Sequence, residues 1–157
     1  MLSSIKTDFS INPLNTNYAL DINQARLATF SNLSGGEMEI IPIKHNVVYF
    51  SGELRTLLIP GPTHFSPIVM ERGYGNTKEL YNWFVLANSG KIFNARQNVS
   101  IILNAWLEDG FKPQVGWNLI NAWPTKISGF ESDQTNTASL AKFSITIACE
   151  GIERYDP

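Results

Sequence analysis

The sequence predicts a mainly β protein, a small barrel or sandwich of about seven strands with one α-helix. Most of its apolar segments are short and alternate with polar residues, which is the period of a strand with one buried face. Glycine and proline residues separate these segments, and only one segment has the period of a helix. At 157 residues the chain has the size of one domain, so we expect residues 1–157 to form a single domain around one core.

Five short strands are expected in the first half of the chain. They cover Tyr18–Ile22, Ala25–Phe30, Glu37–Ile43, Leu54–Ile59 and Pro67–Arg72. The segment IPGPTHFSP (59–67) contains three prolines and a glycine, which exclude it from the centre of a sheet.

The segment KHNVVYFSGE (44–53) lies between two of these strands and is too apolar for an ordinary exposed loop. Val47, Val48, Tyr49 and Phe50 follow one another without a polar residue. The core can take two of them by alternation, but not all four. Because contiguous apolar patches on soluble proteins normally mark a contact site, we expect this loop to be one.

The predicted helix covers about residues 77–88. In TKELYNWFVLANSG, four apolar residues recur at the spacing i, i+3, i+4 and i+7, which places Leu80, Trp83, Phe84 and Ala87 on one face. Asn76 or Thr77 can cap the start of this helix, and the pair Ser89-Gly90 can end it. We expect this face to pack on the β body.

The second half of the chain predicts a long hairpin and a final strand. The Asp-Gly turn in EDGF (108–111) should fold residues 100–106 back against residues 115–123. In the segment SLAKFSITIACEG, apolar residues from Ala141 to Cys149 alternate with polar ones. This strand should therefore have one dry face and one wet face.

No pattern in the sequence predicts catalysis, a metal site or a cofactor site. His45 and His64 are the only histidines, and their separation matches no metal-binding motif. Cys149 is the only cysteine, which excludes an internal disulfide and a thiolate zinc site. The carboxylate pairs at 108–109 and 131–133 lie in polar, turn-like segments where solvated side chains are expected. We expect a protein that is not an enzyme.

Charge and hydropathy argue against two further classes of protein, namely DNA-binding proteins and proteins with a signal peptide or membrane span. With 12 basic and 14 acidic residues and no basic cluster, the chain lacks the electrostatic footprint of a DNA-binding protein. The N-terminal segment MLSSIKTDFSINPLN lacks the basic region and apolar run of a signal peptide, and no segment is apolar enough to span a membrane. We expect a protein that is made in the cytoplasm and has no membrane anchor.

Three segments, read in order, resemble the tail tube proteins of contractile-tailed bacteriophages and of related contractile injection systems. They are IPGPTHFSPIVMERGYGNTKELYNWF, VSIILNAWLEDG and WNLINAWPTKISGFESDQTNTASLAKFSITIACEGIER. The residues that match the family motifs are Pro60, Gly61, Glu71, Arg72, Gly73, Leu80, Tyr81, Trp83, Phe84, Asp109, Gly110, Trp117, Asn121, Ala122, Trp123, Pro124, Lys126, Gly129, Glu150, Gly151, Ile152 and Arg154. The resemblance covers roughly residues 54–155, and Ile127 stands where the family often has tryptophan.

The resemblance implies the phage tail tube fold and a structural role. In this family, subunits form six-membered rings that stack into a hollow inner tube inside a contractile sheath. The implied partners are further copies of the chain, the sheath protein, and baseplate and tube-terminating proteins. DNA or protein cargo would pass through the lumen without specific binding. Assembly would take place in the cytoplasm and give a phage virion tail or an injection particle that can be released from the cell.

The resemblance also suggests which residues serve the assembly. In similar tubes the loop at 44–53 reaches toward a neighbouring subunit or ring, so Val48 with Phe50, or Val47 with Tyr49, would insert into the adjacent ring. The wet face of the last strand, which consists of Lys142, Ser144 and Thr146, would look into the channel. The motif tryptophans Trp117 and Trp123, the latter followed by Pro124, would clamp their strand to the core.

Two alternatives remain open from the sequence. A baseplate or tube-terminating relative of the same fold would form rings without stacking. A protein of another class, a small monomeric ligand-binding β-barrel, would use Trp106, Trp117 and Trp123 to line a pocket.

Overall fold

The computed structural model describes residues 16–73, 77–129 and 142–157. Within them the chain forms ten strands and two helices. In chain order these are β1 (Thr16–Ile22), β2 (Ala25–Phe30), β3 (Asn32–Gly35), β4 (Met38–Val48), β5 (Leu54–Phe65), β6 (Ile68–Gly73), α1 (Lys78–Asn88), α2 (Ile92–Ala95), β7 (Gln97–Leu107), β8 (Gly110–Ser128), β9 (Lys142–Ala148) and β10 (Gly151–Tyr155). The prediction of a mainly β fold is confirmed, and the predicted helix at about 77–88 is α1.

The body of the protein is an antiparallel sheet that turns on itself through the long strand β8. The strand order is β2-β1-β7-β8-β9-β6-β3, and β10 also pairs with β8. Up to Ala122 strand β8 pairs with β7, and from Trp123 onward it pairs with β9. Asn121, at this change of partner, has a φ of +50°, which is uncommon for a residue other than glycine. Its side-chain amide donates a hydrogen bond of 2.7 Å to Glu150, which holds the bend in place.

Both halves of the sheet contribute to one hydrophobic core. Residues that lie opposite one another in the strand pairs point to the same side, as Leu20 of β1 and Ile101 of β7 do. From the second half of the sheet come Met70, Ile145 and Ile147, each at most 4% exposed. The hairpin expected around residues 108–111 is present, since Leu107 of β7 lies opposite Gly110 of β8.

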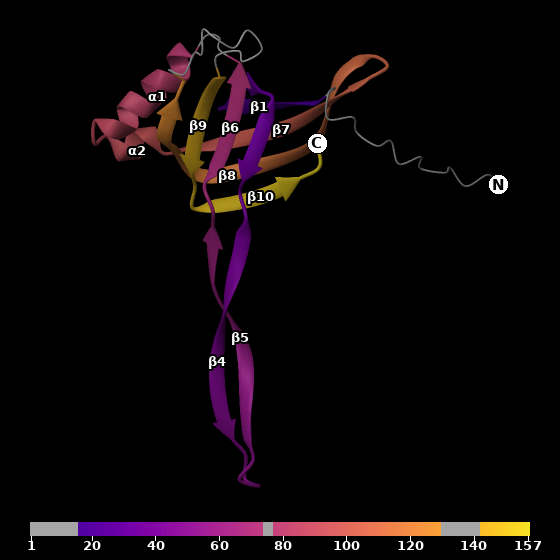
Figure 1. Cartoon of the computed structure of the whole chain (residues 1–157), viewed down its shortest axis with the longest axis vertical. Coiled ribbons are helices and arrows are strands. Elements are labelled where there is room, and N and C mark those ends of the chain that lie inside the picture. The colour runs from indigo at the N-terminus through magenta and orange to yellow at the C-terminus, as the bar shows by residue number, and fades with distance from the viewer. Residues whose placement is uncertain (1–15, 74–76, 130–141) are drawn as a thin grey trace, which may run out of the picture.

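Helix α1 covers one end of this body (Figure 1). Its side chains Leu80 and Trp83 are buried, whereas Phe84 is only half-buried. The sequence analysis did not predict α2, a single turn that packs against α1. The two helices are joined by the indole Nε1 of Trp83, which donates a hydrogen bond of 2.7 Å to the carbonyl oxygen of Ala95.

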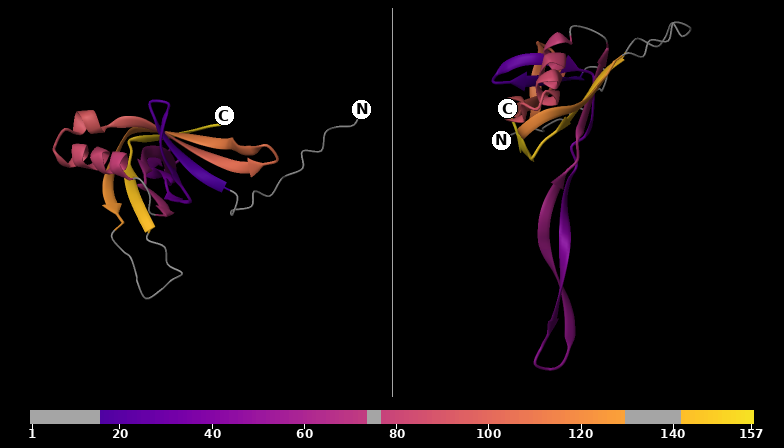
Figure 2. Two further views of the ribbon diagram at one scale, coloured as in Figure 1. Left: turned by 90° about the horizontal axis from the view of Figure 1, so that it is seen from above. Right: turned by 90° about the vertical axis from the view of Figure 1, so that its left-hand side faces the viewer.

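Strands β4 and β5 form a separate two-stranded ribbon that projects far from the body (Figure 1, Figure 2). The expected loop at 44–53 is therefore corrected: residues up to Val48 belong to β4, and only residues 49–53 form a turn. The prolines of residues 59–67 are tolerated because each ribbon strand has one unpaired edge. Gly61 lies at an irregularity in this pairing, where a β-carbon would collide with the carbonyl oxygen of Ile41.

Candidate assembly surfaces

The ribbon of β4 and β5 exposes most of the protein's large apolar surface. Of the 17 large hydrophobic side chains that are exposed among the described residues, 11 lie on the ribbon or its turn. These are Met38, Ile40, Ile41, Ile43, Val48, Tyr49, Phe50, Leu54, Leu57, Leu58 and Ile59. An isolated two-stranded ribbon is marginally stable in water, and exposed apolar patches of this kind are typical of contact surfaces.

Both faces of the ribbon are mostly apolar, as the pairing register establishes. Ile43 lies opposite Ile59, His45 opposite Leu57, and Val47 opposite Arg55. We call the face that these six residues share ribbon face 1.

The next residues along each strand form ribbon face 2. Its cross-strand pairs are Pro42 with Pro60, Lys44 with Leu58, Asn46 with Thr56, and Val48 with Leu54. The Thr56 hydroxyl donates a hydrogen bond of 2.9 Å to Asn46 Oδ1, in agreement with this register. Since strands normally alternate between one wet and one dry face, a ribbon with apolar residues on both faces is unusual for a surface exposed to water.

The turn of the ribbon presents one aromatic side chain entirely to solvent. Phe50 is fully exposed, whereas Tyr49 is 45% exposed and lies 5.2 Å beneath the guanidinium group of Arg55. The turn is closed by two backbone hydrogen bonds, from Tyr49 N to the Glu53 carbonyl (3.0 Å) and from Gly52 N to the Tyr49 carbonyl (2.9 Å). Of the four residues proposed for stacking, Val47 is half-buried and the other three are exposed.

The second candidate surface is the outer face of the sheet formed by β8, β9, β6 and β3. In β9, Lys142 is exposed, Ser144 and Thr146 are half-buried, and the residues between them are buried in the core. The pairing register extends this wet face beyond β9, because Ser144 lies opposite Ser128 and Glu71, and Thr146 lies opposite Lys126. The hydroxyl groups of Ser128 and Ser144 are hydrogen-bonded. The alternation in the sequence predicted the part of this face that lies on β9. The residues opposite it on β6 and β8 could not be predicted, because they depend on which strands pair.

Two smaller apolar patches lie at opposite ends of the body (Figure 1). At the tip of the β7–β8 hairpin, Trp106 is 55% exposed and meets Phe111 edge-on at 5.0 Å between ring centroids. At the helical end, Tyr81 and Val85 of α1 and Phe93 of α2 are exposed. Either patch offers a contact surface to another chain.

The three tryptophans proposed to line one ligand pocket lie in three different places. Trp106 is at the hairpin tip, and Trp123 lies opposite Ala148 in the pairing of β8 with β9. Trp117 lines a small pocket of about 140 Å³ beside β3 and β10. Both Trp117 and Trp123 are half-buried, and Pro124 is fully buried.

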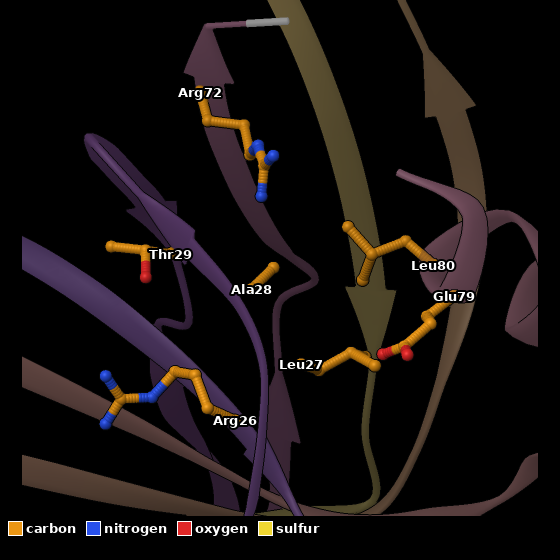
Figure 3. A pocket seen from close by; sticks show the side chains of 7 residues that line it. All are labelled: Arg26, Leu27, Ala28, Thr29, Arg72, Glu79 and Leu80. Atoms are coloured by element: carbon orange, nitrogen blue, oxygen red, sulfur yellow. The ribbon is translucent and has the colours of Figure 1, made fainter. Parts of the chain in front are cut away.

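A larger pocket of about 540 Å³ lies between β2, β6 and α1 (Figure 3). Its charged lining residues are Arg26, Arg72 and Glu79. Arg26 points away from the helix and makes an ion pair of 2.6 Å with Asp21. The pocket combines these side chains with apolar ones and holds no cluster of groups suited to acid–base catalysis among its described lining residues.

The residues considered for metal binding or catalysis do not come together. In the described parts of the chain, no three His, Cys, Asp or Glu side chains are placed to hold a metal ion. His45 and His64 are exposed on the ribbon, and Glu131 and Asp133 lie outside the described residues. Cys149 is half-buried, and this burial raises the pKa of its thiol, against a smaller opposing effect of a hydrogen bond with the backbone of Gly151.

Within the same described ranges, no helix is long and apolar enough to cross a bilayer.

Comparison with solved structures finds the same fold in contractile injection systems. A chain in the sheath–tube complex of the extracellular contractile injection system PVC, in its extended state, superposes with a TM-score of 0.67 at 17% identity, covering 100% of both chains. A chain of the anti-feeding prophage tube-terminating cap has a TM-score of 0.67 at 20% identity, covering 99% of this chain and 97% of that one. A chain of the anti-feeding prophage baseplate has a TM-score of 0.61 at 15% identity, covering 90% of this chain and 93% of that one.

Sequence comparison identifies the family. No protein with a curated description matches the chain. Residues 14–153 match the family of the T4-like virus tail tube protein gp19, which leaves only short segments at either end outside the match. The chain therefore belongs to the T4-like virus tail tube protein family, and it is a structural component of a contractile tail tube.

Proposed function

We propose that residues 1–157 form a single tail-tube domain that assembles into six-membered rings, and that these rings stack into the hollow inner tube of a contractile tail or injection particle. The sheath protein surrounds the tube, and baseplate and tube-terminating proteins bound its ends. Similar chains occur in a sheath–tube complex, a terminating cap and a baseplate, which supports these partners. The function is mechanical and requires no catalytic residue, metal ion or cofactor.

The ribbon of β4 and β5 is the observation that carries this proposal. Its two apolar faces cannot both be covered by the body of the same chain, because the ribbon projects away from that body (Figure 2). A contact that joins a ribbon to a different surface of the next copy is heterologous, and when repeated along an axis it gives an open stack of rings.

Contacts within a ring have a different basis. Within the described residues, strands β2 and β3 end the sheet order and β10 pairs only with β8, so each has an edge available for another chain. The hairpin-tip patch around Trp106 extends the area available to a neighbour. Lateral contacts of this kind close into a ring when the rotation between subunits is suitable.

The lumen is lined, in this proposal, by the polar outer face that contains Lys142, Ser144 and Thr146. The polar and charged side chains on that face keep water in the channel and offer cargo no specific binding site. DNA or protein can therefore pass through after the sheath contracts. The rings assemble in the cytoplasm and become part of a virion tail or a released injection particle.

A tube-terminating role is the second candidate, because the chain of a terminating cap superposes as well as the chain of the sheath–tube complex. A terminator would form rings that stop growth at one end of the tube. The purified protein distinguishes the two roles: a tube protein gives filaments, whereas a terminator gives single rings.

The experiment that tests the proposal replaces residues 46–50 with a Gly-Ser linker. The variant should keep its far-ultraviolet circular dichroism, because the replaced residues lie outside the core. Negative-stain electron microscopy should then find rings where the unmodified protein forms tubes. Long tubes from the variant would contradict the stacking role of the ribbon, and a monodisperse monomer from the unmodified protein at tens of micromolar would contradict the proposed function itself.

A further inference from the structure

The small pocket beside Trp117 is an apolar cavity at the root of the ribbon. It has a volume of about 140 Å³ and is lined by Leu33, Gly35, Gly36, Ile68, Ile101, Trp117 and Ile152. All of these are apolar side chains or glycines. They come from β3, from the connection between β3 and β4, and from the strands β6, β7, β8 and β10.

Two consecutive glycines shape this pocket. Gly35 and Gly36 have φ angles of +81° and +70°, a region that disfavours residues with a side chain. A β-carbon on Gly35 would collide with the carbonyl oxygen of Pro67. At Gly36 it would lie 3.2 Å from Ile68 Cγ1 and 3.9 Å from Ile152 Cδ1, so it would occupy space beside two lining residues. The backbone at the ribbon root thus leaves the pocket open.

The ribbon tip carries the side chain that fits such a pocket. Phe50 is fully exposed, and no other side chain holds it in the turn, whereas the neighbouring Tyr49 is engaged by Arg55. An apolar cavity of about 150 Å³ binds benzene, so a pocket of about 140 Å³ has the size needed for a phenyl ring.

Phe50 cannot reach the pocket of its own chain. Strand β4 contains 11 residues, which at about 3.3 Å per residue places the tip roughly 36 Å from the root. Gly35, Gly36 and Ile68 of the pocket lining lie at the root, and the ribbon extends from there away from the body (Figure 1). A second copy of the chain, displaced along the ribbon by about its length, would bring its own root and pocket to the tip of the first.

We propose, building on the stacked-ring function above, that Phe50 of each subunit inserts into the pocket lined by Leu33, Trp117 and Ile152 of a subunit in the adjacent ring. The contact is a knob and a hole on two different surfaces of the same chain, so it repeats without closing. Other exposed aromatic residues are less suited, because Phe93 lies on a helix of the body and Phe111 packs against Trp106.

Disulfide trapping tests this contact directly. In a Cys149→Ala background, Phe50→Cys combined with Leu33→Cys should give, after mild oxidation of assembled tubes, a ladder of covalent multimers on a denaturing gel. Each single-cysteine variant should give dimers at most. The control pair Phe50→Cys with Phe93→Cys contains a second thiol that is more exposed than the one at residue 33, and it should give no ladder.

A second measurement does not depend on cysteine chemistry. Phe50→Ala should raise the critical concentration for tube formation by at least about tenfold, since burial of an aromatic side chain stabilises each contact by about 1.5–3 kcal/mol and about 1.4 kcal/mol corresponds to a factor of ten. Phe93→Ala should leave it unchanged. Both variants should keep the circular dichroism of the parent protein.

The outcomes separate the two proposals. If the unmodified protein forms no tubes under any condition, the stacked-ring function fails. If it forms tubes, but Phe50→Ala forms them at the same concentration and the cysteine pair at 50 and 33 gives no ladder, the pocket contact is overturned while the tube function stands. A ladder together with a raised critical concentration supports the contact.

Discussion

A charge placed on either ribbon face should block stacking without unfolding the subunit. Leu57 belongs to ribbon face 1, opposite His45, and Leu58 belongs to ribbon face 2, opposite Lys44. The variants Leu57→Glu and Leu58→Glu therefore place the same carboxylate on opposite sides of one ribbon. Neither residue belongs to the hydrophobic core, so both variants should unfold at the same denaturant concentration as the parent.

The free energy that each leucine contributes to stacking follows from its exposed fraction in the subunit. Leu58 is 65% exposed and Leu57 is 43% exposed. Because full burial of a leucine contributes about 1.5–3 kcal/mol, covering Leu58 would contribute about 1–2 kcal/mol per subunit and covering Leu57 roughly two-thirds as much. In a six-membered ring the contributions of all subunits add at every contact between two rings. An unpaired carboxylate in the same position would oppose stacking further, since burial of a charge is unfavourable.

Sedimentation velocity and electron microscopy measure the result. Both variants should sediment as rings, whereas Asn82→Glu, which adds the same charge at an exposed position of α1, should still form tubes. If only one of the two ribbon variants blocks stacking, the ribbon lies flat against a single surface and the enclosure of both faces is refuted. If neither does, the ribbon is not the stacking element.

Three further predictions concern the body. Trp83→Phe removes the hydrogen bond to Ala95 and should lower the free energy of unfolding by about 1–3 kcal/mol. The control Tyr81→Phe, at an exposed position, should lower it by less than about 0.5 kcal/mol, and equal values would exclude a contribution of this bond. Ser144→Cys with Cys149→Ala should react in tubes with a small maleimide but not with one too bulky for the channel; equal labelling would place that face outside. Because burial raises the pKa of the Cys149 thiol, alkylation of this thiol should be slower in the folded than in the unfolded protein, and equal rates would contradict this. For the same reason, the free energy of unfolding should fall as the pH rises through the folded-state pKa.

The sequence predicted those elements whose burial pattern is regular. Leu80 and Trp83 in α1 and the alternating residues of β9 have one buried side each, so periodicity alone located them. Phe84 shares the spacing of that helical stripe but lies at its margin, and how far it is covered depends on the neighbouring strands.

Strands at Glu37–Ile43 and Leu54–Ile59 were predicted, but the full length of the ribbon and its projection from the body were not, because the ribbon has no dry side to produce alternation. Residues 44–48 continue β4, yet both of its faces are apolar and exposed in the subunit, so their pattern resembles an apolar loop. Prolines in 59–67 excluded a central strand correctly, but they are compatible with a ribbon whose strands each have a free edge. The pocket at Trp117 also could not be predicted from the sequence, because its lining residues come from six different places in the chain.

Cryo-electron microscopy of tubes assembled from the purified chain tests the central claim most directly. The account predicts six-membered rings with an axial repeat close to the ribbon length of roughly 36 Å, in which every β4–β5 ribbon is enclosed on both faces by subunits of the adjacent ring. Tubes in which the ribbons of adjacent rings project into solvent, or lie only against subunits of their own ring, would contradict it.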